Sequence, residues 1–252
     1  LGFFTQKGNY GQGRGMPPTG YLEGSELEIN EDGSFEIILS TKEKPGNWLP
    51  MEKDTGTLIV RQTRLDRENE TIAELEIERI GGDSMPTPFD PVKCAEGLTM
   101  SAGLVAGAAM LFANWAEGFK KHTNKLPRFD QNVSNMAGGV PDIAYYHSYW
   151  KLAPDEALVI DAMPPECEHW NFQLNNYWME SLDYRYYPVH VNKHTATYRP
   201  DGSVRVVVAA KDKGFDNWID TVGHEEGTMC WRWVRANEHP EPQTRVVKLS
   251  EL

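Results

Sequence analysis

The sequence of 252 residues contains few cysteines, and their spacing excludes two common ways of stabilising a small domain. Only Cys94, Cys167 and Cys230 are present, and no Cys-x-x-Cys pair occurs. A disulfide framework needs paired cysteines, and a structural zinc site needs closely spaced ligands. We therefore expect neither. Few cysteines are typical of a reducing compartment, which favours a soluble, cytoplasmic protein, although exported proteins with few cysteines also exist.

Basic clusters and familiar catalytic motifs are also missing. The chain has 25 Lys and Arg against 37 Asp and Glu, a net charge of -12. Nucleic-acid binding needs clustered Lys and Arg to neutralise phosphates, so a nucleic-acid partner is excluded. No Gly-rich phosphate loop, Gly-x-Ser-x-Gly elbow or His-Glu-x-x-His motif occurs. No motif therefore names a reaction, and we expect no cofactor.

The first residues, LGFFTQKGNYGQGRGMPPTG, do not form a signal peptide, because no charged segment is followed by an apolar one. The first residue is not Met. We expect an N-terminal part to be missing from this sequence, together with any targeting signal that it carried.

One pattern occurs twice. Asp32-Gly33-Ser34 matches Asp201-Gly202-Ser203, Asn47-Trp48 matches Asn217-Trp218, Gly56-Thr57 matches Gly227-Thr228, and Arg61 matches Arg232. Asp-Gly is a turn signal, because Gly accepts positive φ and Asp bonds its own backbone. A β-branched run follows each turn, then a loop with Asn-Trp, then a second apolar run. Each copy is therefore predicted to form a strand, a loop and a strand.

Strand patterns dominate both ends of the chain. In the first strand of each copy, alternate residues share one face: Phe35, Ile37 and Leu39, and Val204, Val206 and Val208. Further strands are predicted in YLEGSELEIN, TIAELEIERI, EALVIDAM, EHWNFQLNNYW, HVNKHTATYR and QTRVVKLSEL. The long loop between the strands of each copy suits a sandwich or jelly roll. The predicted class is mainly β, with duplicated jelly-roll-like β-sandwich units at 1–83 and 151–252.

Residues 84–150 are predicted to join the two sandwiches through a helix and a loop. Asp90-Pro91 is a helix start signal, and Leu98, Val105, Phe112 and Phe119 recur at helical spacing. We expect a helix over residues 91–122 with these four side chains buried. Residues 97–116 carry no charge, which is long enough to span a membrane. Alanine, glycine and polar residues within them favour a buried helix in a soluble protein without a membrane partner.

The C-terminal third resembles the DUF1214 domain family, whose function is unknown. The resemblance covers about 100 residues from near Tyr145, and its most specific parts are DEALVI, NNYWMESLDY, DGS and NWIDT…G…WRW. The earlier part resembles the DUF1254-like segment that often precedes this domain. The resemblance implies jelly-roll-like β-sandwiches with helices between them. It supplies no catalytic residues.

Two polar clusters are weak candidates for chemistry. His190 and His194 would lie roughly 13 Å apart on one face of a predicted strand, too far for one metal ion. His169 would join them only through folding, so no metal site is expected. Cys167 and His169 would run parallel on one strand face, and neighbouring glutamates oppose a thiolate.

The segment HWNFQLNNYWMESLDYRYY is the strongest candidate for a ligand site. Aromatic faces and amide groups suit sugar rings or flat polycyclic ligands, although a sandwich core is the alternative interpretation. A strand arginine beside it would bind an anionic ligand or pair across the sheet. The predicted ligand-binding residues are Trp170, Asn171, Asn175, Tyr177, Trp178, Tyr184, Tyr186 and Arg232.

Three functions remain open at this point. The first is binding of a small molecule or carbohydrate on this aromatic and amide-rich surface. The second is an enzyme, a lyase or hydrolase acting on a sugar or polycyclic substrate with Tyr, His and Glu as acid and base. The third is a structural or assembly protein. We also expect a homo-oligomer, because residues 97–116 have more apolar surface than one sandwich needs to cover.

Overall fold

The computed structural model describes residues 1–8, 16–64, 66, 69–81, 85 and 88–252. Strands hold 32% of the residues and helices 19%, which confirms the mainly β class. The chain divides into two compact units, unit 1 (residues 1–108) and unit 2 (residues 109–252). The boundary falls inside the long helix α1, Pro91–Phe119.

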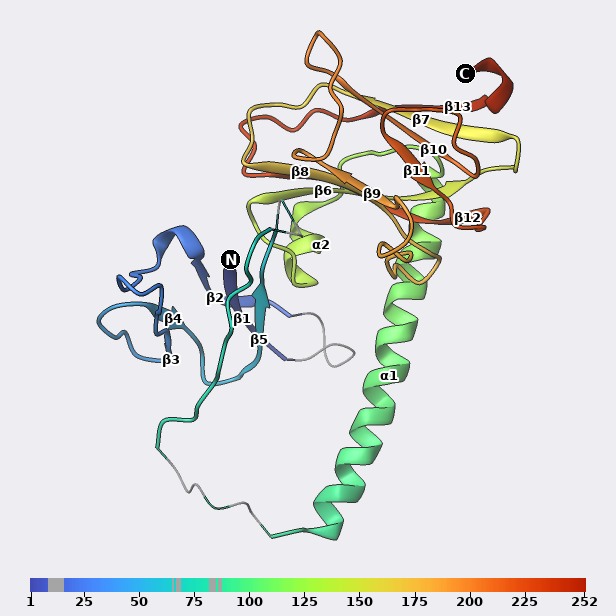
Figure 1. Ribbon diagram of the computed structural model, residues 1–252. Coiled ribbons are helices and arrows are strands. Elements are labelled where there is room, and N and C mark those ends of the chain that lie inside the picture. Colours follow the sequence, from blue (N-terminus) through green and yellow to red (C-terminus); the bar gives the residue numbers. More distant parts are fainter. Residues whose placement is uncertain (9–15, 65, 67–68, 82–84, 86–87) are drawn as a thin grey trace. The chain divides into compact units, whose positions relative to one another are not determined.

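Unit 2 is a sandwich of two four-stranded sheets, one ordered β6-β12-β8-β9 and the other β11-β10-β7-β13 (Figure 1). All pairs are antiparallel except β10 with β11. The strands are β6 Ile143–Lys151, β7 Glu156–Ala162, β8 His169–Leu174, β9 His190–Asn192, β10 Val204–Ala209, β11 Trp218–Asp220, β12 Glu226–Val234 and β13 Gln243–Lys248.

The core of unit 2 lies between these sheets and follows from strand alternation. Val204, Val206 and Val208 point inward together and are fully buried, as their spacing predicts. Trp170 and Trp231 stack at the centre with ring centroids 4.9 Å apart. The opposite face of β10 is also covered, because Val207 packs in a second, smaller apolar cluster.

Unit 1 contains a three-stranded sheet, β2-β1-β5, and a two-stranded parallel pair, β3-β4. Its buried apolar side chains include Phe3, Phe4 and Leu49. The strands are β1 Gly2–Lys7, β2 Pro18–Glu23, β3 Ile38–Ser40, β4 Trp48–Pro50 and β5 Thr55–Arg61.

The repeat predicted from sequence is confirmed at the level of individual hydrogen bonds. Asn47 donates to the carbonyls of Glu28 and Glu36 and accepts from the Glu28 amide. Asn217 does the same with Thr197 and Arg205. In each copy this one amide side chain joins three chain segments, which explains why both copies contain it.

The partner tryptophans and the Asp-Gly turns repeat as well. Trp48 donates its indole N–H to the Ser40 carbonyl, and Trp218 donates to the Ala209 carbonyl. Gly33 and Gly202 both have φ of +84°, a backbone conformation that only glycine adopts freely. Asn-Trp therefore fixes a short parallel strand pair in each unit, β3 to β4 and β10 to β11.

The structural repeat is longer than the sequence match. Phe3 of β1 lies opposite Val60 and Leu22, and Phe172 of β8 lies opposite Trp231 and Val191. Strand order β2-β1-β5 in unit 1 therefore corresponds to β9-β8-β12 in unit 2. We call residues 2–61 the first copy and residues 171–232 the second copy.

The predicted long helix is present, but its predicted burial is wrong at two of the four positions. Phe119 is buried and Phe112 is half-buried, whereas Leu98 and Val105 are 68% and 69% exposed. A 3-10 turn, Lys120–His122, extends the helix, and Pro91–His122 is long and apolar enough to cross a membrane. Helical spacing predicted an apolar face, but no described element packs on the N-terminal two-thirds of that face.

Two other predictions from sequence are wrong. Residues 71–80 form no strand, because alternation alone does not supply a partner strand. The segment expected to be a long loop contains a short helix, α2 Gln131–Met136, and most of β6. Turn residues around β6 hid a strand whose aromatic side chains point to both faces.

Candidate functional site

Exposed aromatic side chains gather on the loop between β8 and β9, residues 175–189, which we call the aromatic loop. Trp178 is 50% exposed, Tyr184 49% and Tyr186 77%. Tyr187 is also exposed, at 43%, and was not among the predicted ligand-binding residues. Four large rings in reach of solvent on one loop are unusual, since aromatic side chains normally gain stability from burial.

Side-chain hydrogen bonds hold the backbone of the aromatic loop. Asn176 accepts from the amides of Trp178 and Glu180 and donates to the Glu180 carboxylate. Asp183 holds Arg185 through two parallel hydrogen bonds of 2.9 Å. The exposed rings are therefore carried on a turn of fixed shape, which lowers the entropy cost of binding a ligand.

Tyr177 links the aromatic loop to the end of α1. Its hydroxyl donates to Glu117 at 2.8 Å, and Lys120 pairs with the same carboxylate at 2.7 Å. The hydrogen bond to Lys120 lowers the pKa of Glu117, and the hydrogen bond to Glu117 raises the pKa of Tyr177. Both pKa values are shifted away from neutral pH, so neither group is suited to exchange protons at neutral pH.

The predicted ligand-binding residues on β8 lie elsewhere. Trp170 is fully buried in the core and donates its indole N–H to the Tyr198 hydroxyl, so it offers no surface to a ligand. Asn175 is buried and accepts a hydrogen bond from Gln173. Asn171 is half-buried on the outer face of the sheet. Tyr177, Trp178, Tyr184 and Tyr186 therefore lie on one loop outside the core, where Tyr177 and Trp178 are in ring contact with centroids 5.1 Å apart, and Trp170 is not part of this group.

Arg232 lies on that outer face, with Asn171 and Tyr145 on the neighbouring strands. Its guanidinium donates to the Asn171 side-chain oxygen at 3.0 Å and lies 5.8 Å from the centre of the Tyr145 ring. In the first copy, Arg61 lies 5.0 Å from the centre of the Phe4 ring. A strand arginine over an aromatic ring is thus common to both copies, which supports a structural role.

Sequence reasoning missed His147, which lies on the same face beside Cys230. These residues are direct partners in the β6–β12 register. His147 stacks between Phe119 and Tyr145, with centroids 5.5 and 5.4 Å away. Burial, and to a smaller extent the charge of Arg232, lowers its pKa from 6.5 to about 3. The alternating pattern Tyr-x-His-x-Tyr in β6 was the available signal.

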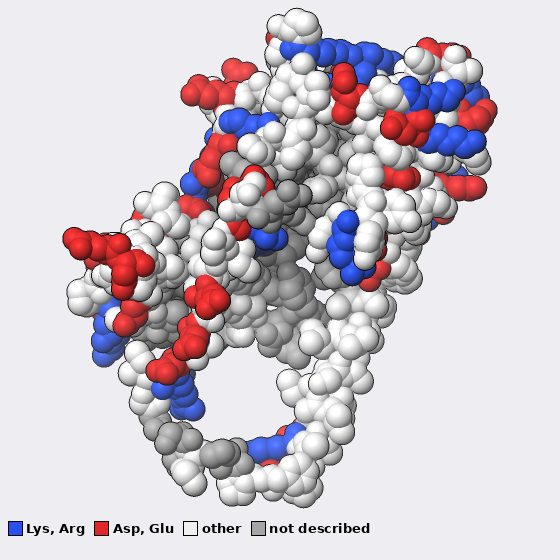
Figure 2. Space-filling view, viewed as in Figure 1, with Lys and Arg blue, Asp and Glu red and all other residues white. Residues whose placement is uncertain are grey.

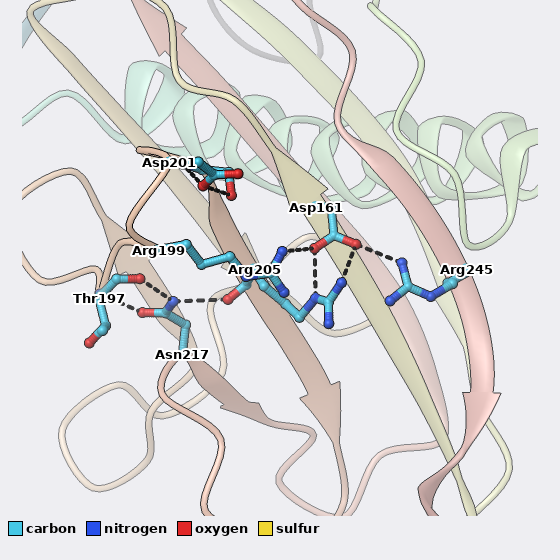
Figure 3. A network of polar contacts seen from close by, with 8 residues as sticks. Asp161, Thr197, Arg199, Asp201, Arg205, Asn217 and Arg245 are labelled. Carbon is cyan, nitrogen blue, oxygen red and sulfur yellow. Dashed lines mark hydrogen bonds and ion pairs between the residues drawn. The ribbon is translucent and has the colours of Figure 1, made fainter. Parts of the chain in front are cut away.

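A second polar cluster lies on the outer face of the other sheet (Figure 3). Asp161 on β7 accepts two hydrogen bonds from Arg205, at 2.6 and 2.9 Å, and one from Arg245 at 2.6 Å. Arg199 adds an ion pair at 3.3 Å. Burial raises the pKa of Asp161, but these hydrogen bonds outweigh it and the net shift is downward. The cluster ties β10, β7 and β13 together across the sheet.

A small cavity of about 200 Å³ lies beside this cluster. Arg199, Arg205 and Asp216 contribute charge to its lining, and Val207 and Phe215 contribute apolar surface. It is smaller than most ligand pockets and holds none of the predicted ligand-binding residues. We therefore assign the cluster a structural role.

The structure also shows where the two weak candidates for chemistry lie, namely the pair His190 and His194 and the pair Cys167 and His169. His190 is the first residue of β9, whereas His194 follows that strand in a turn. Burial raises the pKa of the Cys167 thiol and lowers the pKa of His169, so neither is shifted toward an ion pair. Among the residues that the structure describes, no three His, Cys, Asp or Glu side chains gather as metal ligands.

The fold and the internal repeat together define a β-sandwich protein that contains two copies of one structural unit. Comparison with known families identifies the family to which it belongs. A model described as a protein of unknown function, DUF1214, matches residues 18–64 and 157–238, about half of the chain and parts of both copies. The chain belongs to the DUF1214 family. No comparison shows the DUF1254-like segment, which stays a prediction.

Comparison with solved structures gives a strong match. The crystal structure of an uncharacterized protein from Burkholderia cenocepacia matches with a TM-score of 0.96 and 52% identity, over 100% of this chain and 70% of its own. The VPA0106 protein from Vibrio parahaemolyticus matches with a TM-score of 0.36 and 15% identity, over 64% of this chain and 47% of its own. A search of curated proteins found no match.

Proposed function

We propose that this protein binds a small molecule or a carbohydrate through the aromatic loop. The observation that carries the proposal is the exposure of Trp178, Tyr184 and Tyr186 on a loop whose backbone is held by its own side chains. Aromatic faces stack on the apolar faces of sugar rings and of flat polycyclic molecules. Tyrosine hydroxyls and the amide of Asn176 add hydrogen-bond partners at the edges of such a ligand.

A binding screen tests this proposal. Oligosaccharides, sterols and aromatic acids are added to the protein, and binding is followed by the thermal midpoint and by ligand-observed NMR. Trp178→Ala and Tyr186→Ala should each weaken binding at least about tenfold, as loss of a stacking anchor does. Phe89→Ala is the matched control, because Phe89 is an equally exposed ring, at 78%, outside the loop.

Binding that survives both loop substitutions would contradict the proposal, and so would a panel in which no compound binds. Binding lost equally in the Phe89→Ala control would show that exposed rings bind without selectivity. Only loss confined to the aromatic-loop variants supports a site there.

The enzyme alternative requires an acid and a base beside the same rings. Tyr177 and Glu117 are the titratable pair that meets there, and their pKa values move apart, away from neutral pH. This arrangement favours binding over proton-transfer chemistry. Turnover of a bound sugar, abolished by Tyr177→Phe with binding retained, would support an enzyme instead.

The assembly alternative is supported by a different feature, the exposed apolar surface of α1. Leu98, Val105 and Met110 are each more than 65% exposed. Figure 2 shows no charged atoms along the middle of this helix. As a second candidate we propose that two copies of the chain associate through α1, with the same surface used on both chains.

Gly103→Leu tests association through α1. A Cβ added at Gly103 meets nothing within 4 Å, so the larger side chain fits the single chain. Light scattering at micromolar concentration should then show weaker association than in the unsubstituted protein. Gly97 is equally open and provides the control Gly97→Leu at the edge of the uncharged stretch. A monomeric unsubstituted protein would overturn this alternative.

A further inference from the structure

We infer that the first copy is an incomplete sandwich that binds two further strands, one equivalent to β6 beside β5 and one equivalent to β7 beside β3, from a segment of the same protein outside these 252 residues. The inference rests on the two copies, which share their hydrogen-bond framework but differ in what covers them. It is independent of the function proposed for the aromatic loop.

In unit 2, three strands outside the second copy complete the sandwich, and two of them, β6 and β7, pair directly with strands of that copy. β6 pairs along the whole length of β12, and β7 pairs along the whole length of β10. Leu158 and Ile160 of β7 enter the same buried cluster as Val206 and Val208 of β10. The strands β6 and β7 therefore supply both backbone pairing and apolar cover.

In the first copy, the strands equivalent to β10 and β12 pair only with strands of that copy in the described residues. β3, the equivalent of β10, pairs with β4, and β5, the equivalent of β12, pairs with β1. In the described part of unit 1, no strand occupies the place that β7 or β6 takes beside its equivalent.

Burial differs accordingly at matched positions. The strand predicted to contain Phe35 and Ile37 is shorter than expected, since β3 begins at Ile38 and these two residues come just before it. Phe35, Ile37 and Leu39 correspond to Val204, Val206 and Val208, which are all fully buried. The three side chains of the first copy are only half-buried, although they are at least as apolar and larger. Apolar side chains gain about 25 cal/mol for each Å² removed from water, so a strand that covers these three side chains would be stabilised here.

The second strand shows the same difference. Cys230 and Trp231 of β12 are buried, whereas the matched Ile59 is half-buried and Val60 is 37% exposed. Aliphatic residues therefore stand at positions where the described chain covers them only in part. This is the pattern of a sheet that accepts a strand from elsewhere.

The repeat also indicates where the covering strands belong. In unit 2, β6 and β7 come directly before β8, the equivalent of β1. The matched strands of the first copy would therefore precede β1 in the polypeptide. The Burkholderia cenocepacia chain, of which only 70% is matched here, contains residues beyond the matched part.

Hydrogen–deuterium exchange read by mass spectrometry tests the inference, with the second copy as an internal reference. In the 252-residue chain, amides of residues 35–40 and 57–60 should exchange about 100-fold faster than those of 204–209 and 228–231, because uncovered strands open more easily. In the natural polypeptide that contains this chain, the first-copy amides should become protected about 100-fold. The second-copy amides should not change.

Variants distinguish a covering strand from general stabilisation. In the natural polypeptide, Leu39→Lys should remove the added protection of residues 35–40, because a charge would face the covering strands. Glu36→Lys is the matched control, since Glu36 is exposed on the same segment. Loss of protection in both variants alike would contradict a covering strand.

Three results would overturn the inference. One is equal protection of both copies in the 252-residue chain. Another is protection that rises with protein concentration, which would show that a second copy of the chain covers the strands. The third is a natural polypeptide that adds no protection to residues 35–40 and 57–60.

Discussion

Acidification should destabilise unit 2 through His147, well above the pH at which carboxylates titrate. The imidazole stacks between two rings at 5.4 and 5.5 Å, and Phe129 approaches it edge-on at 5.4 Å. Although part of the residue's surface remains exposed, the enclosure of its ring in this cluster lowers its pKa to about 3 in the folded protein. In the unfolded chain the same group titrates near its ordinary pKa of about 6.5.

The sign and size of the effect follow from these two values. Between about pH 6.5 and pH 3 the unfolded chain binds a proton at His147 and the folded chain does not. The free energy of unfolding therefore falls as pH falls through this window, by about 1.4 kcal/mol for each pH unit. At pH 5 the loss should be about 2 kcal/mol.

Urea unfolding at pH 7, 6 and 5 measures this loss, with the protein compared to His147→Phe. Phenylalanine keeps the stacking and cannot take up a proton. The free energy of unfolding of the variant should therefore fall less steeply with decreasing pH, by about 1.4 kcal/mol per pH unit. Burial also lowers the pKa of His169 and His239, but both remain in the variant and cancel in the comparison. Parallel pH curves, or an NMR titration of His147 near pH 6.5, would refute the reasoning.

Three further predictions concern stability and are measured by urea unfolding. Asn217→Ala should cost about 2 kcal/mol, because three backbone groups lose their partner around a buried side chain, while Asn47→Ala in the more exposed copy should cost about 1 kcal/mol. Equal costs would contradict the argument from burial. Asp161→Asn should cost about 2 kcal/mol at pH 7, because three arginines lose one carboxylate. The lowered pKa of Asp161 means that its contribution is fully present above its unfolded pKa of about 4 and is lost as pH falls through the lower pKa of the folded protein. The difference between the two proteins should therefore shrink as the pH falls below about 4, and a constant difference would be inconsistent. Gly202→Ala should cost about 1 kcal/mol, because its φ of +84° strains any side chain, and an unchanged midpoint would count against this.

Features that depend on short-range chemistry were predictable from the sequence. The Asp-Gly turns, the Asn-Trp loop and the inward face of β10 each follow from a few adjacent residues. Their repetition strengthened the prediction, because two independent segments had to satisfy the same backbone geometry. The long helix was also predictable, since its start signal and apolar spacing are local.

Features that depend on distant neighbours were not predictable. Burial of Leu98 and Val105 needs another element over α1, and an apolar spacing does not say whether one is there. Trp170 and Trp178 have similar surroundings in sequence, yet one lies in the core and the other at the surface. Only the strand register, which decides where β8 ends, separates a core ring from a candidate ligand-binding ring.

The parallel pair of β10 and β11 has a consequence for the order of folding. Its residues are close in sequence, since Val207 lies opposite Trp218, and Asn217 secures the connection from within the same loop. The pair of β12 and β6, by contrast, joins Cys230 to His147. Closing a short loop costs less chain entropy than closing a long one. We therefore expect the Asn-Trp unit to form early as a local nucleus and the pairing of β6 with β12 to form later, an order that mutational analysis of folding rates would check.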